Sequence, residues 1–314
     1  MSVQLSIVIP CYRSEAALPE LHRRLTGALE CVEPDFEVIL VDDCGGDNTW
    51  GVIQELARKD SRIRGLKLAR NYGQHNALLC GIRAARGEVI VTIDDDLQNP
   101  PEEIHKLLSK LAEGYDVVYG SPENGTHGFF RNQASRITKI ALQGAMGVES
   151  ASKASAFRAF RTRLREAFEA YRSPSVNIDV LLTWGTARFS SVSVRQDDRT
   201  IGDSGYSLKK LVNHAINMMT GFSVLPLQIA SLLGLAFGAL GLLILLYVIG
   251  RYLIEGSSVP GFPFLASLIA IFSGVQLFAL GVIGEYIARM HFRSMERPPY
   301  SLQERTTDDR NEHI

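Results

Sequence analysis

Residues 90–98 read Ile-Val-Thr-Ile-Asp-Asp-Asp-Leu-Gln, an apolar run that ends in three carboxylates and an amide. Such a run is typical of a buried strand in a parallel sheet, and ligands of open α/β sheets bind outside the carboxyl ends of the strands. Asp94, Asp96 and Gln98 are spaced by two, so in an extended chain they project to the same side. The stretch therefore predicts an α/β fold with an acidic ligand site where this strand ends.

The chemistry of these side chains favours a metal site. Crowded carboxylates repel one another unless a cation joins them. Oxygen ligands favour Mg²⁺ or Mn²⁺, and these ions often complete their coordination with substrate phosphates. We therefore expect Asp94, Asp96 and Gln98 to be metal ligands. The alternative is a solvated acidic turn before a helix that begins at Pro100-Pro101-Glu102-Glu103, because proline and acidic residues are favoured in a first helical turn.

The segment around this stretch alternates apolar runs with amphipathic ones, from Gln4 to about Tyr119. Alternating βα units of this length predict a parallel sheet that is covered by helices on both faces. The expected strands are 5–10, 37–42, 63–69, 89–94 and 116–119. The expected helices are 16–30, 48–59, 76–85 and 101–113.

Composition narrows the class of protein. The chain has 314 residues, with 33 basic and 34 acidic side chains, so its bulk charge indicates no nucleic-acid partner. A chain of this length forms one large domain or two smaller ones. The cysteines lack CxxC or CxxH spacing, which favours reduced thiols over a disulfide framework or a zinc site. They are Cys11, Cys31, Cys44 and Cys80.

Two long runs near the C-terminus carry no formal charge, residues 222–250 and 256–284. Each exceeds the roughly 20 apolar residues that cross a bilayer. We expect two transmembrane helices within 222–290, at about 224–250 and 262–288. A buried helix pair in a soluble protein is the alternative.

Charges around these runs set the expected topology. Lys209 and Lys210 precede the first run, Arg289 and Arg293 follow the second, and the segment between the runs holds only Arg251 as a cation. The positive-inside rule then places both termini and the N-terminal domain in the cytosol. The first eight residues are too short and polar for a secretory signal.

Two further segments combine apolar and cationic residues at helical spacing, 126–147 and 206–221. Helices of this type lie in the headgroup layer of a membrane; ordinary packing on the sheet is the alternative. The expected domains are therefore 1–205 (which contains the first interfacial helix), 206–221 as a second interfacial helix, the hairpin in 222–290 and a flexible polar tail in 291–314.

Other expected strand ends supply polar groups to the same edge of the sheet. The first strand ends in Pro10-Cys11-Tyr12, the second in Asp42-Asp43, and the third leads into a segment of cationic, amide and aromatic residues at 70–76. Carboxylates at such an edge accept hydrogen bonds from a base or a ribose hydroxyl. The chain has no GxGxxG and no GxxxxGK[ST], so phosphates here would be neutralised by the metal. This suits a nucleoside diphosphate that leaves as an anion.

These motifs, in this order, resemble the inverting family 2 glycosyltransferases of the GT-A fold, and most of all the polyprenyl-phosphate glycosyltransferases. Relatives of that kind include undecaprenyl-phosphate glucosyltransferases, the undecaprenyl-phosphate formamido-arabinose transferase and dolichol-phosphate mannose synthases. The resemblance extends over nearly the whole chain. It rests on residues 8–12, 41–43, 71–75, 94–103, 199–207 and 284–289, followed by the two-span C-terminus.

The resemblance implies a role for each motif. Asp42 and Asp43 would hold the base, which the resemblance implies is the uracil of a UDP sugar, with Pro10, Tyr12, Arg70, Asp94 and Asp95 also at the nucleotide. Asp94, Asp96 and Gln98 would meet Mg²⁺ or Mn²⁺ and the diphosphate, and the catalytic candidates are Asp95 and Asp96. The implied oligomer is a homotetramer.

The implied acceptor is undecaprenyl phosphate, which would enter from the bilayer between the interfacial helices. Candidates to bind its phosphate are Arg131, Arg136, Arg199 and Lys209. Arginine suits this task because its planar guanidinium binds phosphate oxygens bidentately. The resemblance thus implies inverting transfer of a sugar from a nucleotide sugar to a lipid phosphate at the cytoplasmic face of the bacterial inner membrane, for modification of a cell-envelope glycan.

The chain departs from the family pattern in three motifs. Arg13-Ser14 stands where the family often has Asn-Glu, and Gly205 stands where it has Lys. Ala156 occupies a position where several relatives have an Asp proposed as the catalytic base. A membrane-anchored nucleotide-sugar-binding scaffold is therefore one alternative function. A processive polysaccharide synthase is another, although the chain lacks the QxxRW motif of that class.

Overall fold

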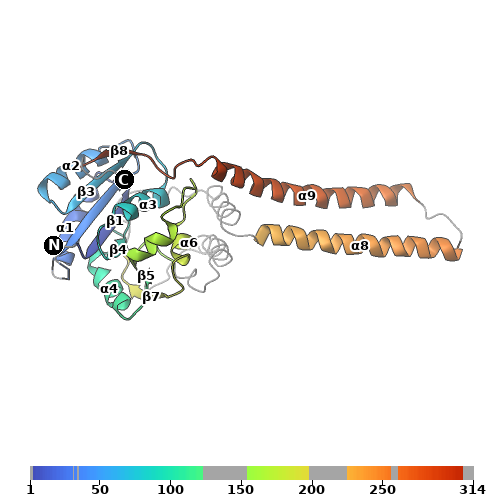
Figure 1. Cartoon of the computed structure of the whole chain (residues 1–314), viewed down its shortest axis with the longest axis horizontal. Coiled ribbons are helices and arrows are strands. Elements are labelled where there is room, and N and C mark those ends of the chain that lie inside the picture. Colours follow the sequence, from blue (N-terminus) through green and yellow to red (C-terminus); the bar gives the residue numbers. More distant parts are fainter. Residues whose placement is uncertain are drawn as a thin grey trace.

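The computed structural model describes residues 3–30, 32–33, 35–122, 154–197, 225–255 and 261–306. It contains an α/β domain and two long helices that extend away from the same end of that domain (Figure 1). The predicted fold class, an α/β domain followed by a helical hairpin, is confirmed.

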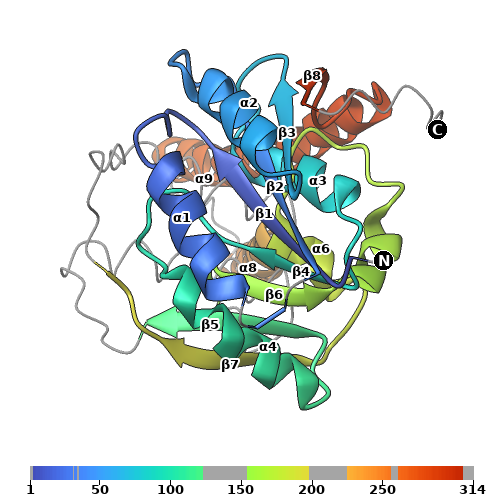
Figure 2. The ribbon, with the colours of Figure 1, turned by 90° about the vertical axis from the view of Figure 1, so that its left-hand side faces the viewer.

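An eight-stranded sheet forms the centre of the domain, in the order β7-β5-β6-β4-β1-β2-β3-β8 (Figure 2). The neighbouring strands β4, β1, β2 and β3 are parallel, as are β5 and β7. In contrast, β6 is antiparallel to both of its neighbours, and β8 is antiparallel to β3. The strand bounds are β1 Leu5–Cys11, β2 Phe36–Asp42, β3 Ile63–Leu68, β4 Val89–Thr92, β5 Val117–Pro122, β6 Arg158–Arg161, β7 Phe189–Val194 and β8 Leu302–Arg305.

Helices cover both faces of this sheet. One hydrophobic cluster joins α1, α2 and α4 to the sheet, and a second joins α3 and α6 to the opposite face. The bounds are α1 Leu18–Leu29, α2 Thr49–Lys59, α3 Gln74–Ala84, α4 Ile104–Ala112 and α6 Ile178–Thr183, with 3-10 turns η1 Pro101–Glu103 and η3 Thr162–Phe168.

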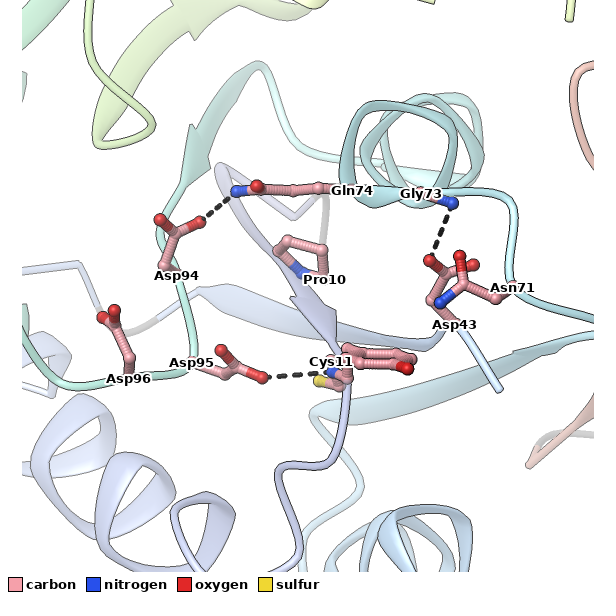
Figure 3. A pocket seen from close by; sticks show the side chains of 10 residues that line it. Pro10, Cys11, Asp43, Asn71, Gly73, Gln74, Asp94, Asp95 and Asp96 are labelled. Atoms are coloured by element: carbon pink, nitrogen blue, oxygen red, sulfur yellow. Dashed lines mark hydrogen bonds between the residues drawn. The ribbon is translucent and has the colours of Figure 1, made fainter. Parts of the chain in front are cut away.

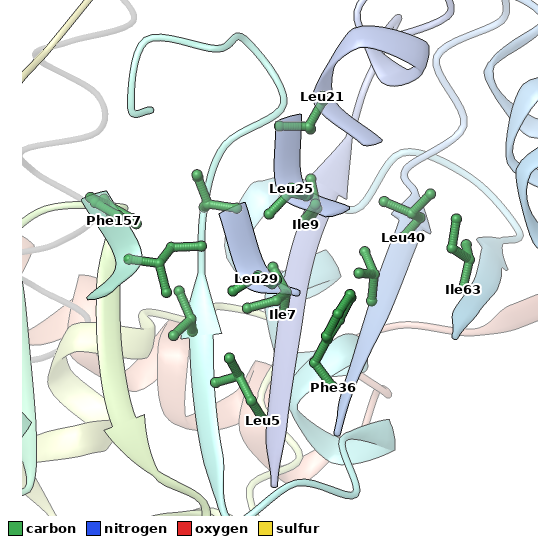
Figure 4. Packing of buried hydrophobic residues seen from close by; sticks show 14 of the residues in the cluster. Leu5, Ile7, Ile9, Leu21, Leu25, Leu29, Phe36, Leu40, Ile63 and Phe157 are labelled. Atoms are coloured by element: carbon green, nitrogen blue, oxygen red, sulfur yellow. The ribbon is translucent and has the colours of Figure 1, made fainter. Parts of the chain in front are cut away.

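The alternation of side chains along β1 explains the two clusters. Ile9 lies beside Leu25 of α1 and Ile7 beside Leu29 (Figure 4), whereas Val8 belongs to the cluster on the α3 face. Every residue of β1 is buried, which is the pattern of a central parallel strand with both faces covered. Gly81 lets α3 approach closely, because a Cβ there would lie 2.4 Å from Cγ1 of Val8. α3 is therefore packed directly on β1 and β2.

The two C-terminal helices, α8 Leu225–Glu255 and α9 Phe262–Ser294, lie side by side (Figure 1). The rings of Phe237 and Phe272 pack edge to face between them, with centroids 6.2 Å apart. Pro226–Ile254 and Ile271–His291 are long and apolar enough to cross a membrane, and the protein buries none of the most apolar part of either span. A core helix pair of a soluble protein would be buried, so the exposed apolar surface favours membrane spans.

The structure corrects the expected tail, 291–314. α9 continues to Ser294, and residues 302–305 form β8 at the edge of the sheet rather than a flexible segment. Backbone pairing with β3 explains why residues 302–305 form a strand. The edge of β3 offers unpaired N–H and C=O groups, and an added strand forms hydrogen bonds with them. The domain therefore draws on chain from beyond the hairpin and is not contained in 1–205.

Candidate active site

A hollow of about 330 Å³ opens at the carboxyl ends of β1, β2 and β4 (Figure 3), within the size range of small-molecule sites. The end of β1 forms its floor, the segment after β4 lies on one side, and the residue after β2 and the segment before α3 lie on the other. The lining residues are Pro10, Cys11, Tyr12, Asp43, Asn71, Gly73, Gln74, Asp94, Asp95 and Asp96.

Asp43 organises one side of the hollow. Its carboxylate accepts the backbone N–H of Tyr72 at 2.7 Å and that of Gly73 at 2.8 Å, and the residue is only 3 % exposed. Gly73 has φ of +94°, a conformation that glycine adopts without a steric penalty. Burial raises the pKa of Asp43, while the two backbone donors oppose that rise. Each carboxylate oxygen accepts more than one hydrogen bond, so Asp43 can bind a ligand donor as well.

Asp95 joins the other side to the end of β1. It accepts the backbone N–H of Tyr12 at 3.2 Å and the hydroxyl of Ser14. Burial raises the pKa of Asp95, and these two donors lower it. Ser14 thus supports a pocket carboxylate at a position where the family pattern has a different residue.

Asp94 and Asp96 are half-buried on the same side of the hollow. The side-chain amide of Gln74 donates to Asp94 at 2.6 Å (Figure 3). Burial, together with the charges of Asp96 and Asp95, raises the pKa of Asp94 to about 7. The protein alone therefore carries an electrostatic strain here that a bound cation would relieve.

The donor set fits a divalent cation that substrate oxygens help to hold. Among the described residues, no group of three or more His, Cys, Asp or Glu side chains is arranged to enclose a metal ion. Mg²⁺ and Mn²⁺ sites with one or two carboxylates complete their coordination with water and phosphate. Asp94 and Asp96 supply carboxylates of that kind, on the wall of a hollow with space for a diphosphate.

A buried arginine side chain lies next to the strand that leads to the acidic side of the hollow. Arg158, on β6 and 1 % exposed, forms an ion pair with Asp179 and donates to the hydroxyl of Thr92 at 3.1 Å. Its charge lowers the pKa of Asp94 and so opposes the rise caused by burial. Thr92 also donates to the carbonyl of Ala156 at 2.7 Å, which places Ala156 beside the strand that leads to the acidic residues.

The family comparisons agree with this geometry. The model of the glycosyl transferase family 2 matches residues 6–172, which contain every residue that lines the hollow. The chain belongs to glycosyl transferase family 2.

Curated relatives of this glycosyltransferase extend the match through the hairpin. An undecaprenyl-phosphate 4-deoxy-4-formamido-L-arabinose transferase of Pseudomonas paraeruginosa is 35% identical over 95% of this chain and 89% of its own length. The transferase of the same name from Shewanella sediminis is 35% identical over 96% of this chain and 92% of its own.

Among solved structures, glucosyl-3-phosphoglycerate synthase from Mycobacterium tuberculosis, in complex with Mn²⁺, UDP and phosphoglyceric acid, matches 69% of this chain and 76% of its own. The TM-score is 0.50 at 17% identity. At that identity the likeness concerns the fold alone, and it agrees with a GT-A architecture.

The structure of this glycosyltransferase brings together six of the predicted site residues and separates three others. Pro10, Tyr12, Asp43, Asp94, Asp95 and Asp96 all line the hollow. Asp42 does not line it: the side chain is buried and accepts the N–H of Cys44. The exposed Arg70 also lies outside the lining, with its guanidinium 4.6 Å from the ring centroid of Tyr72.

The prediction for Gln98 was wrong in its geometry. β4 ends at Thr92, and residues 95–99 form turns and bends, with Leu97 at φ of +60°. The extended conformation that would align Gln98 with Asp94 and Asp96 is therefore absent, and Gln98 is not in the lining. Its backbone N–H instead donates to Asp96 at 3.1 Å, so Gln98 supports a pocket carboxylate through its backbone.

The remaining predicted residues, Arg131, Arg136, Arg199 and Lys209, lie outside the described part of the chain, as do both expected interfacial helices, 126–147 and 206–221. Residues outside the predicted set also take part in the site. Cys11, Asn71, Gly73 and Gln74 line the hollow, and Ser14 donates to Asp95. Gln74 belongs to the segment 70–76 that the sequence placed at this edge of the sheet. Its contact with Asp94 depends on how α3 packs on the sheet, which the sequence pattern does not give.

Proposed function

We propose that this family 2 glycosyltransferase transfers a sugar from a nucleotide sugar, a UDP sugar by resemblance, to undecaprenyl phosphate at the cytoplasmic face of the bacterial inner membrane. The observation that carries the proposal is one hollow with Asp43 on one side and Asp94, Asp95 and Asp96 on the other, in a chain that carries two candidate membrane spans. The printed names of the curated relatives support the same acceptor. The product would be a polyprenyl-monophosphate sugar for envelope glycan modification.

Each side of the hollow would hold a different part of the donor. The nucleoside would lie on the Asp43 side, where carboxylate and backbone groups offer polar contacts; Tyr12 is also in the lining. The diphosphate would lie toward Asp94 and Asp96, which would hold a divalent ion, Mg²⁺ or Mn²⁺. When bound, such an ion stabilises the charge on a leaving diphosphate.

The acceptor phosphate needs little activation by a base. A phosphate monoester has a second pKa of about 6, so near neutral pH it is mostly a dianion. Its oxygen forms the new bond to the anomeric carbon while the bond to the diphosphate breaks, which inverts the anomeric centre. The Ala156 position therefore does not prevent transfer. Asp95, held by Tyr12 and Ser14, would orient the sugar.

The acceptor would reach the hollow from the membrane beside α8 and α9. We include in the proposal the phosphate contacts of Arg131, Arg136, Arg199 and Lys209, because guanidinium and ammonium groups bind phosphate oxygens. The tetrameric assembly and the cytosolic placement of both termini also belong to the proposal. They rest on the family resemblance and on the distribution of Lys and Arg around the apolar runs.

A panel of nucleotide sugars tests the proposal. The full-length protein in detergent or vesicles is incubated with undecaprenyl phosphate, Mn²⁺ or Mg²⁺, and each donor in turn, and the lipid fraction is analysed by mass spectrometry. We expect one donor to give undecaprenyl phosphate increased by the mass of a single glycosyl group. A product with several sugar units would favour the processive synthase, and donor binding without any lipid product would favour the scaffold.

A further inference from the structure

The segment that follows the second membrane helix contacts the pocket loop at both of its ends. We define the pocket loop as residues 70–75, which contribute Asn71, Gly73 and Gln74 to the hollow. Before the loop, the backbone N–H of Ala69 donates to the carbonyl of Ser301 at 2.9 Å. After it, the side-chain amide of Asn76 donates to the carbonyl of Pro299 at 2.5 Å. Residues 299–301 therefore bridge the two ends of the loop.

The Asn76 contact is buried and uses both amide hydrogens. Asn76 is 6 % exposed, lies in the first turn of α3, and donates to the carbonyl of Pro174 at 3.0 Å as well as to Pro299. An aspartate at this position would have the same shape but would have no N–H to donate. A buried carbonyl that loses its donor carries a desolvation cost, so this position is sensitive to a change of a single atom.

The bridge is anchored to the domain by packing. Tyr300 and Leu302 pack against the hydrophobic cluster that includes α3, and so does Tyr72 of the pocket loop. The guanidinium of Arg83, also on α3, lies 5.8 Å from the ring centroid of Tyr300. β8 then pairs with β3 (Figure 2). Residues 299–301 thus cannot move away without disrupting apolar contacts.

The connection to the membrane helix is short. α9 ends at Ser294, Glu296 adopts φ of +49°, and Pro298 and Pro299 follow, with Pro299 buried. Proline fixes φ and limits the flexibility of a connection. A few residues of limited flexibility therefore connect the hairpin to the pocket loop. Figure 1 shows the chain returning from the end of α9 to β8 at the edge of the sheet.

We propose that residues 299–301 act as a strap that holds the nucleotide pocket loop in its binding conformation, and that Asn76 is the positioning residue through which it acts. Asn76 does not line the hollow; it fixes the start of α3, and with it the backbone N–H groups of Tyr72 and Gly73 that meet Asp43. The inference rests on the proposed function in one respect, since it takes the hollow to be the nucleotide site.

The test compares three variants of the full chain. Asn76→Asp removes both donated hydrogen bonds, and Tyr300→Ala loosens the strap without changing the loop. Glu304→Gln is the matched control, because Glu304 holds β8 through Trp50 at 2.8 Å and Lys67 at 3.3 Å, away from the loop. The readouts are UDP affinity, the KM for donor and for lipid, kcat, and hydrogen exchange of peptides covering 70–76.

We expect Asn76→Asp and Tyr300→Ala to speed exchange in 70–76 and to raise the Kd for UDP and the donor KM by about tenfold, because each change releases the pocket loop from its binding conformation. The lipid KM and kcat should change less than about threefold, because the loop holds the donor rather than the acceptor. Glu304→Gln should leave all of these values near wild type.

Unchanged exchange and UDP affinity in a folded Asn76→Asp protein would overturn the inference, as would an equal effect of Glu304→Gln. The exchange measurement does not depend on the substrate. If wild-type protein transferred no sugar, the proposed function would fail, whereas faster exchange in Asn76→Asp alone would still support the strap.

Discussion

Asp43 connects the end of β2 to the loop before α3, and its two oxygens meet two successive backbone N–H groups. A carboxylate is suited to this position because both of its oxygens accept hydrogen bonds. An asparagine would place an NH₂ group against one of the N–H donors. The conformation of the pocket loop thus depends in part on the two acceptor oxygens of this side chain.

We predict that Asp43→Asn weakens UDP binding by about 10- to 100-fold, because the variant leaves a backbone donor unpaired and displaces the loop. Isothermal titration of the purified protein with UDP measures the effect. Glu55→Gln, which removes an exposed carboxylate paired with Lys59 on α2, is the control for charge and should bind as wild type. Equal affinities for UDP in Asp43→Asn and wild type would exclude this role.

For single residues, the sequence alone predicted that the acidic side chains lie at the site, but it did not predict all of their hydrogen-bond partners. Asp94, Asp95, Asp96 and Asp43 follow strand ends, which the apolar runs reveal. Gln98 was misplaced because a turn conformation, with Leu97 at φ of +60°, cannot be read from a two-residue spacing. The Ser14 contact with Asp95 joins positions 81 residues apart, and such a contact follows from tertiary packing alone.

The elements of the domain are joined by charged contacts as well as by the apolar core. Asp60 follows α2, and its carboxylate pairs with Arg62 at 2.9 Å, just before β3, and with His22 of α1 at 3.3 Å. The hydrogen bond from Arg62 is the main cause that lowers the pKa of Asp60 to about 2. One carboxylate therefore ties three neighbouring elements together.

This shift predicts a pH-dependent contribution to stability. Because the folded-state pKa is depressed, the stabilisation is present above the unfolded value of about 4 and is lost as pH falls toward about 2. Asp60→Asn should lower the free energy of unfolding by about 1–2 kcal/mol at neutral pH, after allowance for partial solvent screening of Arg62. Denaturant unfolding at several pH values checks this: the difference between wild type and variant should shrink below about pH 4. A constant difference would contradict it.

Elements with strong periodicity were predictable, and the mixed part of the sheet was not. The strands of the βα units were expected from apolar runs between amphipathic helices. β6 and β7 lie in the half of the domain where this alternation stops, and β8 follows the hairpin. β8 reads Leu-Gln-Glu-Arg and is largely exposed, so hydrophobic pattern gives no sign of it. It pairs with the edge of β3, and this long-range contact cannot be read from the local sequence.

The whole molecule combines a pocket at one edge of the sheet with an apolar hairpin anchored close to that sheet. α8 and α9 expose large apolar side chains along their length, for example Leu235 at 72% and Leu253 at 77%. Water would penalise such surface, whereas lipid would not. In the proposed function, the two helices hold the pocket, which binds a water-soluble nucleotide sugar, near an acceptor that lies in the membrane.

The proposed topology predicts which thiols are accessible from outside the membrane. Cys44 is exposed on the α/β domain, and Cys11 and Cys80 are buried. In a Cys31→Ser background, a membrane-impermeant maleimide applied to intact spheroplasts should label Ser257→Cys, between α8 and α9, and should label Cys44 only after lysis. Labelling of Cys44 in intact spheroplasts would place the α/β domain outside the cytosol and would contradict the proposed topology.

Sugar transfer by wild-type protein and by Asp96→Asn in the same vesicles is the most direct test of the account. The measurement is the rate at which radiolabel passes from the donor identified by the panel to extractable undecaprenyl phosphate, with Mn²⁺ or Mg²⁺ and after chelation. Glu102→Gln is the control, because that carboxylate pairs with Arg24 outside the hollow. We predict that chelation stops transfer, that Asp96→Asn lowers the rate by at least about 100-fold, and that the control keeps its activity. Undiminished transfer in Asp96→Asn, or transfer that persists without a divalent ion, would contradict the account.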